Sequence, residues 1–396
     1  MSRYLHLLSD DAKFSGYIQD YFEFVAPGQN SYLVLAVNGK KANSHVDKGS
    51  LLVATSMRDA EKQYKQRLPT AIAVIVHGLW APSRKLLAHT PHQCPIAWCL
   101  FGGDVFNGRF WPETHWLESK TQKLQIALCK NKERKFRPVL TACVKKLYPQ
   151  HYKRKHEEIL SQYRRVDLLA TTFMEDYQSV VERLGLNAEH CEFINYNIDD
   201  TVTSTLRNAT TEGQDILVGN SATPSNNHLE VLETLAHCRR DFRHAILPLS
   251  YGNNEYASHI TKRGTQLLGN QLRPLHDFMP RDEFNHSLLT VKCAVFNHIR
   301  QQGFGTALTL AWLGARLFMH PRSSTYRFFL KLGIAVEPFH SSSDKSFACK
   351  LRPLDMSERI ANRTALSKHF SQDRVRQLAS QLINRLSAMH NEKSLR

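Results

Sequence analysis

The stretch HIRQQGFGTALTLAWLGARLFMHP, residues 298–321, decides the fold of the second half of this 396-residue chain. It follows an apolar run at 293–296, passes through a polar turn with two glycines, and continues as an apolar segment of helical length. An apolar run, a polar turn and a helix in succession form the repeating unit of a parallel α/β sheet. The apolar run at 316–319 predicts the next strand of that sheet.

The start of this helix, expected near Thr306, is predicted to bind an anion. Backbone N–H groups are free at a helix N-terminus, and the helix dipole favours negative charge there. Gly303 and Gly305 let a phosphate approach the backbone closely, and Arg300 offers a forked cationic donor suited to a diphosphate. The alternative is a plain turn, because the segment lacks the third glycine of a dinucleotide fingerprint.

Two further stretches, ILVGNSATPSNNHLEVL at 216–232 and ILPLSYGNNEYASHI at 246–260, also place a polar turn after an apolar run. Such turns meet at one edge of a parallel sheet, where phosphate and ribose groups commonly bind. The alternative for the first is that Ser225 or Asn226 only caps a helix. The candidate ligand-binding residues in the three turns are Asn220 and Ser221, which would support a phosphate, and Tyr251, Asn253, Glu255, Gln301 and Gln302, of which the two glutamine amides could bind sugar hydroxyl or acetamido groups.

Short apolar runs alternate with helical patterns along the whole chain, which predicts an α/β fold with parallel sheets. The polar, Thr-rich stretch 199–214 is expected to link a domain at 1–198 to a second at 215–345, with a helical segment at 346–396. The two α/β halves are expected to face a cleft, beyond the carboxyl ends of their strands. The predicted strands are 4–8, 32–37, 71–76, 96–100, 167–170, 216–218, 245–249, 267–268, 293–296 and 316–319.

The last predicted helix, from about 372 to 389, has a single apolar stripe at steps of three and four residues. Such a face has to pack against another part of the protein, and the first domain is one possibility. The residues of the stripe are Val375, Leu378, Leu382 and Leu386.

The formal net charge of +16 is concentrated between residues 120 and 165, which contain fourteen Lys or Arg and three acids. A basic block attracts an anionic membrane surface or a nucleic acid, or it is simply a solvated helical face. No helix-turn-helix, RRM or zinc-finger signature supports nucleic acid. The stretch 138–147 instead predicts an interfacial amphipathic helix, with an ordinary helix that faces the core as the alternative. The basic residues expected at the membrane or acceptor are Lys145, Lys146, Lys153, Arg154 and Lys155.

The eight cysteines are scattered without the spacing of a zinc site, so we expect no structural metal and free thiols in a reducing compartment. The N-terminus lacks a secretory signal pattern, and no apolar stretch reaches the length of a membrane span. The sequence therefore predicts a cytoplasmic protein whose contact with a membrane is peripheral.

In the first half, Asp104 and His77 stand where predicted strands end, beside glycines. An acid or a histidine at the cleft can accept the proton of an attacking hydroxyl group. Asp104 is the first candidate for this general base and His77 the second. The alternatives are a turn aspartate and a structural histidine held by hydrogen bonds.

These segments resemble a known family, the TDP-4-acetamido-4,6-dideoxygalactose transferases (glycosyltransferase family 56) of enterobacterial common antigen assembly. The resemblance spans roughly residues 70–340 and is strongest in the second half. The matching pieces are Ile216-Leu-Val-Gly-Asn-Ser221, the Asn253-Asn-Glu255 turn, Arg300-Gln-Gln-Gly303 with Gly305-Thr306 and, more weakly, His77-Gly78 and Gly102 with Asp104.

The resemblance implies a GT-B architecture of two Rossmann-like domains, with a dTDP-sugar donor held by the second. It implies an undecaprenyl-diphosphate-linked saccharide as acceptor, and a peripheral place on the inner face of the bacterial cytoplasmic membrane. No metal or other cofactor is expected, because helix N-termini and basic side chains can neutralise the departing diphosphate.

The chain departs from the family pattern around the basic segment 120–165 and at its C-terminal end, where it is longer than expected. Phe101 also stands where a tryptophan is expected in the family. The acceptor half matches least, so the acceptor stays open. A glycosyltransferase that uses another nucleotide sugar for a surface polysaccharide is the main alternative. A basic nucleic-acid-binding protein and a catalytically silent homologue that serves as a scaffold are the other two.

Overall fold

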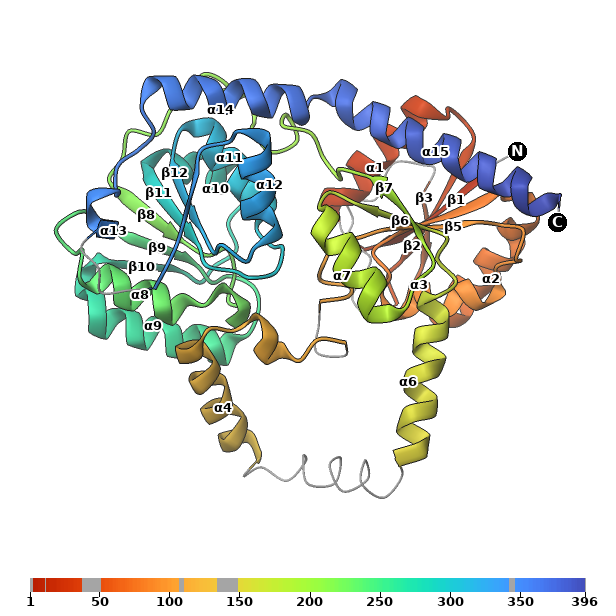
Figure 1. The fold of residues 1–396 in the computed structure, drawn as a ribbon, viewed down its shortest axis with the longest axis horizontal. Coiled ribbons are helices and arrows are strands. Elements are labelled where there is room, and N and C mark those ends of the chain that lie inside the picture. Colours follow the sequence, from red (N-terminus) through yellow and green to blue (C-terminus); the bar gives the residue numbers. More distant parts are fainter. Residues whose placement is uncertain are drawn as a thin grey trace. The chain divides into compact units, whose positions relative to one another are not determined.

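The computed structural model describes residues 3–10, 12–37, 51–106, 110–133, 149–341 and 346–395. Over these residues the chain forms two units, each built on a parallel sheet covered by helices (Figure 1). The first unit comprises Met1–Phe110, Leu140–Asn197 and Gln372–Arg396, and the second comprises Trp111–Val139 and Ile198–Ser371.

The first unit contains a seven-stranded sheet in the order β3-β2-β1-β4-β5-β6-β7, in which every pair of neighbours is parallel. The central strands are buried along nearly their whole length, as expected when helices cover both faces of a parallel sheet. The strands are β1 (Tyr4–Ser9), β2 (Asn30–Leu35), β3 (Leu51–Ala54), β4 (Ala73–His77), β5 (Ile96–Cys99), β6 (Leu168–Thr171) and β7 (Glu189–Glu192).

The C-terminal helix α15 (Gln372–Ser394) belongs to this first unit and packs against α1 (Ala12–Val25). Its predicted apolar stripe is confirmed, because the side chains at 375, 378, 382 and 386 are fully buried. The other helices of the unit are α2 (Met57–Arg67), α3 (Ala81–Leu86), α6 (Pro149–Tyr163) and α7 (Met174–Leu184).

The second unit contains a six-stranded sheet in the order β10-β9-β8-β11-β12-β13, again with parallel neighbours throughout. The chain order reverses between β8 and β11, and a topological switch point of this kind is where α/β sheets bind ligands. The strands are β8 (Asp215–Val218), β9 (Ala245–Pro248), β10 (Leu272–Leu275), β11 (Val291–Phe296), β12 (Arg316–Met319) and β13 (Val336–Pro338).

Helices α8 and α9 pack together on one face of this sheet, and α11 lies on the other face with α12 (Figure 1). Helix α4 packs against α8, and α14 packs against α11. The helices are α4 (Ser119–Glu133), α8 (His228–Ala236), α9 (Asn254–Leu268), α10 (Arg281–Ser287), α11 (Phe304–Leu313), α12 (Ser324–Leu332), α13 (Ser346–Cys349) and α14 (Met356–His369).

The strand predicted at 267–268 is wrong, because these residues are the last turn of α9. Gly269, with a φ of 59°, ends that helix, and the strand β10 begins three residues later. The stretch 199–214, expected to be a linker, packs on the second unit through the buried Val202 and Leu206. Among the helices within the described residues, none is long and apolar enough to cross a bilayer.

Candidate functional site

The turn that follows β8 is shaped by one buried amide, Asn226. Its Oδ1 accepts the backbone N–H of Asn220 at 3.0 Å, and its Nδ2 donates to the carbonyl of Ser221 at 3.0 Å. Gly219 has a φ of 67°, and a Cβ there would lie 2.6 Å from the Asn226 Oδ1. Asn226 therefore holds the turn rather than capping α8, which has no side-chain cap.

The polar turns after β8, β9 and β11 meet in one hydrogen-bonded network, as the sequence predicts. Asn220 Nδ2 donates to the hydroxyl of Tyr251 at 3.0 Å, and Gln302 Nε2 donates to Asn220 Oδ1 at 3.1 Å. The hydroxyl of Ser225 donates to Gln302 Oε1 at 2.8 Å. Three of the predicted ligand residues thus form a connected polar surface at the carboxyl edge of the sheet.

Helix α11 begins at Phe304, two residues earlier than predicted, so Gly305 and Thr306 lie in its first turn. Gly303 is the N-cap residue with a φ of 65°, and no side chain caps the free N–H groups. A Cβ at Gly303 would approach the Asn220 side chain to 3.1 Å, so glycine suits this close packing. The open helix end can accept an anion.

Arg300 is a half-buried cation just before this helix end. Among the described residues no carboxylate forms an ion pair with it, and its one hydrogen bond is a 3.5 Å contact from Nη1 to the carbonyl of Gln301. Burial lowers the pKa of Arg300 to about 10, because removing a guanidinium from water disfavours its charged form, while nearby Tyr251 opposes the shift. A bound anion would supply the missing partner.

The remaining predicted residues of this unit have more local contacts. Asn253 caps α9 by accepting the N–H of Tyr256 at 3.0 Å, and Glu255 lies half-buried in the first turn of that helix. Ser221 shares a short hydrogen bond with the hydroxyl of Thr223.

The segment around Glu118 also lies at this edge of the sheet, although it is distant in the sequence and was not predicted to belong there. The backbone N–H of Glu118 donates to Asn227 Oδ1 at 2.8 Å, and Asn227 Nδ2 donates to the carbonyl of Asn297 at 2.9 Å. The buried Glu230 accepts the N–H of Thr121 at 2.9 Å and its hydroxyl at 2.6 Å. The polar triplet Asn226-Asn227-His228 was the only sequence signal for these contacts.

The two candidate bases lie inside the first unit. Asp104 is 2% exposed, and its Oδ2 accepts the N–H of Leu79 at 2.8 Å and the indole N–H of Trp98 at 2.7 Å. Burial raises the pKa of Asp104, with these hydrogen bonds opposing the shift. His77 is also 2% exposed; its Nε2 lies 3.1 Å from His6 Nδ1, and burial lowers its pKa well below the usual value.

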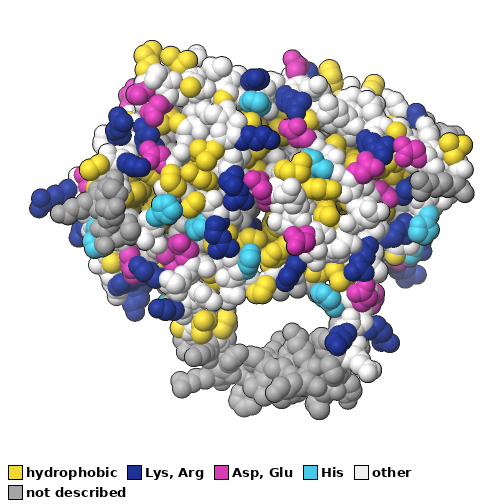
Figure 2. All heavy atoms as spheres, in the orientation of Figure 1, with side chains coloured by type: hydrophobic (Ala, Val, Ile, Leu, Met, Phe, Trp, Pro, Cys, Tyr) yellow, Lys and Arg dark blue, Asp and Glu magenta, His cyan; other side chains and the backbone are white. Residues whose placement is uncertain are grey.

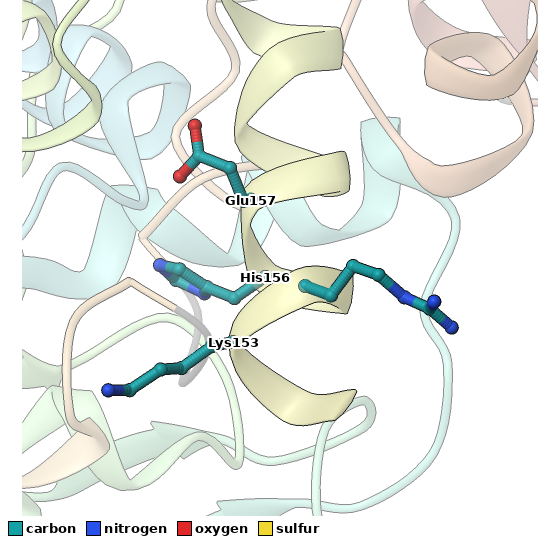
Figure 3. Close-up of a pocket in the computed structure, with 4 residues that line it drawn as sticks. Lys153, His156 and Glu157 are labelled. Carbon is teal, nitrogen blue, oxygen red and sulfur yellow. The ribbon is translucent and has the colours of Figure 1, made fainter. Parts of the chain in front are cut away.

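The basic residues Lys153, Arg154 and Lys155 are exposed on α6, and basic side chains are visible along this helix (Figure 2). Lys153, His156 and Glu157 project to the same side of α6 and, with Arg154, line a surface hollow (Figure 3). Lys145 and Lys146, with the predicted helix at 138–147, lie outside the described residues. In the part of the chain that is described, His, Cys, Asp and Glu side chains do not gather into a group able to hold a metal ion.

Solved structures similar to the whole chain define its fold. One is the N-terminal domain of trehalose-6-phosphate phosphatase from Candida albicans, with 10% identity, a TM-score of 0.64 and coverage of 98% of this chain and 97% of that chain. Another is a glycosyltransferase from Rickettsia africae, with 11% identity, a TM-score of 0.61 and coverage of 98% of both chains. A third is HepE from Anabaena, solved in complex with UDP-glucose, with 11% identity, a TM-score of 0.61 and coverage of 97% and 100%. Two parallel α/β units of this kind form the GT-B fold.

The family comparison is more specific. Residues 160–334 match the family described as 4-alpha-L-fucosyltransferase, glycosyl transferase group 56. The matched range contains all three polar turns, so the resemblance predicted from their motifs is confirmed. Residues 160–334 are thus similar to family 56, and the chain is a glycosyltransferase enzyme.

The role of Asn226 in shaping the turn after β8 can be tested by Asn226→Ala. The change leaves the Asn220 N–H and the Ser221 carbonyl without their partners, and each such buried group costs about 1–3 kcal/mol. We expect a loss of about 2–4 kcal/mol in the free energy of unfolding, measured by urea denaturation followed by tryptophan fluorescence. Asn254→Ala, at an exposed site on α9, is the control and should change stability by less than about 0.5 kcal/mol. Equal stabilities for the two variants would contradict the assigned role.

Proposed function

We propose that this glycosyltransferase moves a 4-acetamido-4,6-dideoxyhexose from a dTDP-sugar to an undecaprenyl-diphosphate-linked saccharide in surface polysaccharide synthesis, as in enterobacterial common antigen. The description of the matched family names a fucosyl group, which is a 6-deoxyhexose, and this supports a deoxy sugar as the transferred group. A transferase of the same class that uses another nucleotide sugar is the alternative.

The observation that carries the proposal is the half-buried Arg300, which has no carboxylate partner among the described residues and lies three residues before the open end of α11. A guanidinium binds a diphosphate through paired hydrogen bonds, and the free N–H groups at Gly305 and Thr306 add to this positive region. As the glycosidic bond breaks, negative charge builds on the departing dTDP, and preformed positive groups stabilise it. In this proposal the neutralisation needs no metal ion.

The network of Asn220, Tyr251 and Gln302 supports the placement of the donor, because its amide and hydroxyl groups suit a nucleoside and a sugar. Ser221, Gln301, Asn253 and Glu255 are further proposed contacts on the same sheet edge.

The first unit, in this proposal, binds the acceptor and supplies the general base. Asp104 remains the first candidate, because a carboxyl group whose pKa is raised accepts a proton more readily than one in water. His77 is the second candidate, since its lowered pKa keeps the imidazole neutral.

The basic side chains of α6 support a peripheral place on the inner face of the bacterial cytoplasmic membrane. Lys153, Arg154 and Lys155 are exposed and have no ion-pair partner among the described residues. Each basic residue near an anionic bilayer contributes about 1 kcal/mol to binding.

The diphosphate role predicts that Arg300→Ala lowers turnover of the dTDP-sugar by about a hundredfold, as when a preformed donor to a developing anion is removed. Arg300→Lys should recover only part of this loss, because it keeps the charge but not the forked geometry. The measurement is release of dTDP with a lipid-diphosphate saccharide acceptor.

Arg240→Ala removes an exposed arginine elsewhere in the same unit and serves as the matched control. Turnover of Arg300→Ala equal to that of Arg240→Ala would remove the diphosphate role and, with it, the main support for this donor site.

The membrane role predicts that replacing Lys153, Arg154 and Lys155 together by Gln weakens binding to vesicles of phosphatidylglycerol and phosphatidylethanolamine by up to about a hundredfold. Co-sedimentation of the protein with the vesicles measures this binding. The control replaces Lys62, Lys85 and Lys262, three exposed lysines outside α6, and removes the same charge. If both triple variants bind the vesicles equally, α6 is not the membrane-facing element.

A further inference from the structure

The carboxylate of Glu118 lies at the carboxyl ends of the two central strands β11 and β12. Its Oε2 accepts a hydrogen bond from Asn297 Nδ2 at 2.7 Å, and its Oε1 lies 3.5 Å from His320 Nε2. Asn297 is the first residue after β11, and His320 is the first residue after β12. The backbone contact with Asn227, which joins the β8 side, places Glu118 at the switch point of this sheet.

The hydrogen bonds around His320 direct its Nε2 towards this carboxylate. The N–H of Arg322 donates to His320 Nδ1 at 3.0 Å, so Nδ1 acts as an acceptor and Nε2 is the atom that donates to Glu118. The nearby Lys120 ammonium pairs with Glu233 instead.

Glu118 is thus an ionised carboxylate with unused capacity to accept hydrogen bonds. Burial raises its pKa, but the hydrogen bonds from His320 and Asn297, together with electrostatic attraction from His320 and Lys120, lower the pKa overall. Its side chain is 23% exposed, and a carboxylate has about four lone-pair positions, of which these two contacts use two. Next to it, Asn297 Oδ1 is fully buried with no hydrogen-bond partner among the described residues.

An ionised carboxylate accepts hydrogen bonds and donates none. Its negative charge repels phosphate, whereas neutral hydrogen-bond donors, namely hydroxyl and amide N–H groups, are attracted to it. The cationic part of the edge is close by, because Asn297, which binds Glu118, is followed by the buried His298, whose pKa is lowered by burial and then by the charge of Arg300. One edge of the sheet therefore presents a positive region at Arg300 and α11, and a negative acceptor at Glu118.

We propose that Glu118 is a specificity-determining residue that binds the transferred hexose of the donor by accepting a hydrogen bond from its hydroxyl or acetamido N–H group. This inference rests on the proposed function, in which Arg300 and α11 hold the diphosphate of the same donor. The nucleotide and the sugar are then held by groups of opposite charge.

The test compares binding of dTDP and of dTDP-4-acetamido-4,6-dideoxygalactose by isothermal titration calorimetry, without acceptor, in the full chain carrying Glu118→Gln or Glu118→Ala. We expect the affinity for dTDP to stay within about twofold of wild type. The affinity for the sugar nucleotide should fall by about tenfold or more, because a hydrogen bond to a charged group is lost.

Glu230→Gln is the matched control, since Glu230 anchors the same segment but is 1% exposed and faces Thr121. It should leave the ratio of the two affinities unchanged, even where it lowers the melting temperature. A Glu118 variant that weakens both ligands equally, or neither, overturns the inference, because the carboxylate is then only an anchor. Wild-type protein that binds neither ligand overturns the proposed donor instead.

Discussion

The central physical constraint in this protein is a guanidinium held partly out of water, with no carboxylate to balance it in the part of the chain that the structure describes. Arg300 loses hydration free energy in this position, and its pKa falls accordingly. By contrast, the buried Arg316 of the same unit is paired with Glu337 and Glu358. An unpaired, desolvated cation beside an uncapped helix end is stabilised by a bound anion, and this is the basis of the proposed diphosphate site.

The turns around Arg300 owe their shape to buried amides and to glycines with positive φ. Asn226 fixes the turn after β8, and that turn presents Asn220 to Gln302. Gly303 allows the start of α11 to pack against the Asn220 side chain. These contacts bring three turns to one edge before any ligand binds, which lowers the entropic cost of binding.

Much of this arrangement could be predicted from the sequence, because the central strands are continuous apolar runs and their polar turns are local in the chain. The four edge strands β3, β7, β10 and β13 were missed or misplaced. Strands β7, β10 and β13 contain charged residues, as in the EHCE of β7, and so lack a continuous apolar run, whereas β3 is a short, partly exposed apolar run, LLVA.

The position of Glu118 could not be predicted either, since it depends on hydrogen bonds to residues more than one hundred positions away. The packing of α15 is similar. Its apolar stripe was visible in the sequence, but its place in the first unit follows only from contacts with α1. Each unit is thus completed by a segment that is distant in the sequence.

The most direct measurement is a crystal structure of the full chain with bound dTDP. The account predicts diphosphate oxygens at hydrogen-bonding distances of about 2.7–3.2 Å from the Arg300 guanidinium and from the backbone N–H groups of the first turn of α11. Nucleotide density elsewhere, with Arg300 and that helix end free of phosphate, would contradict it.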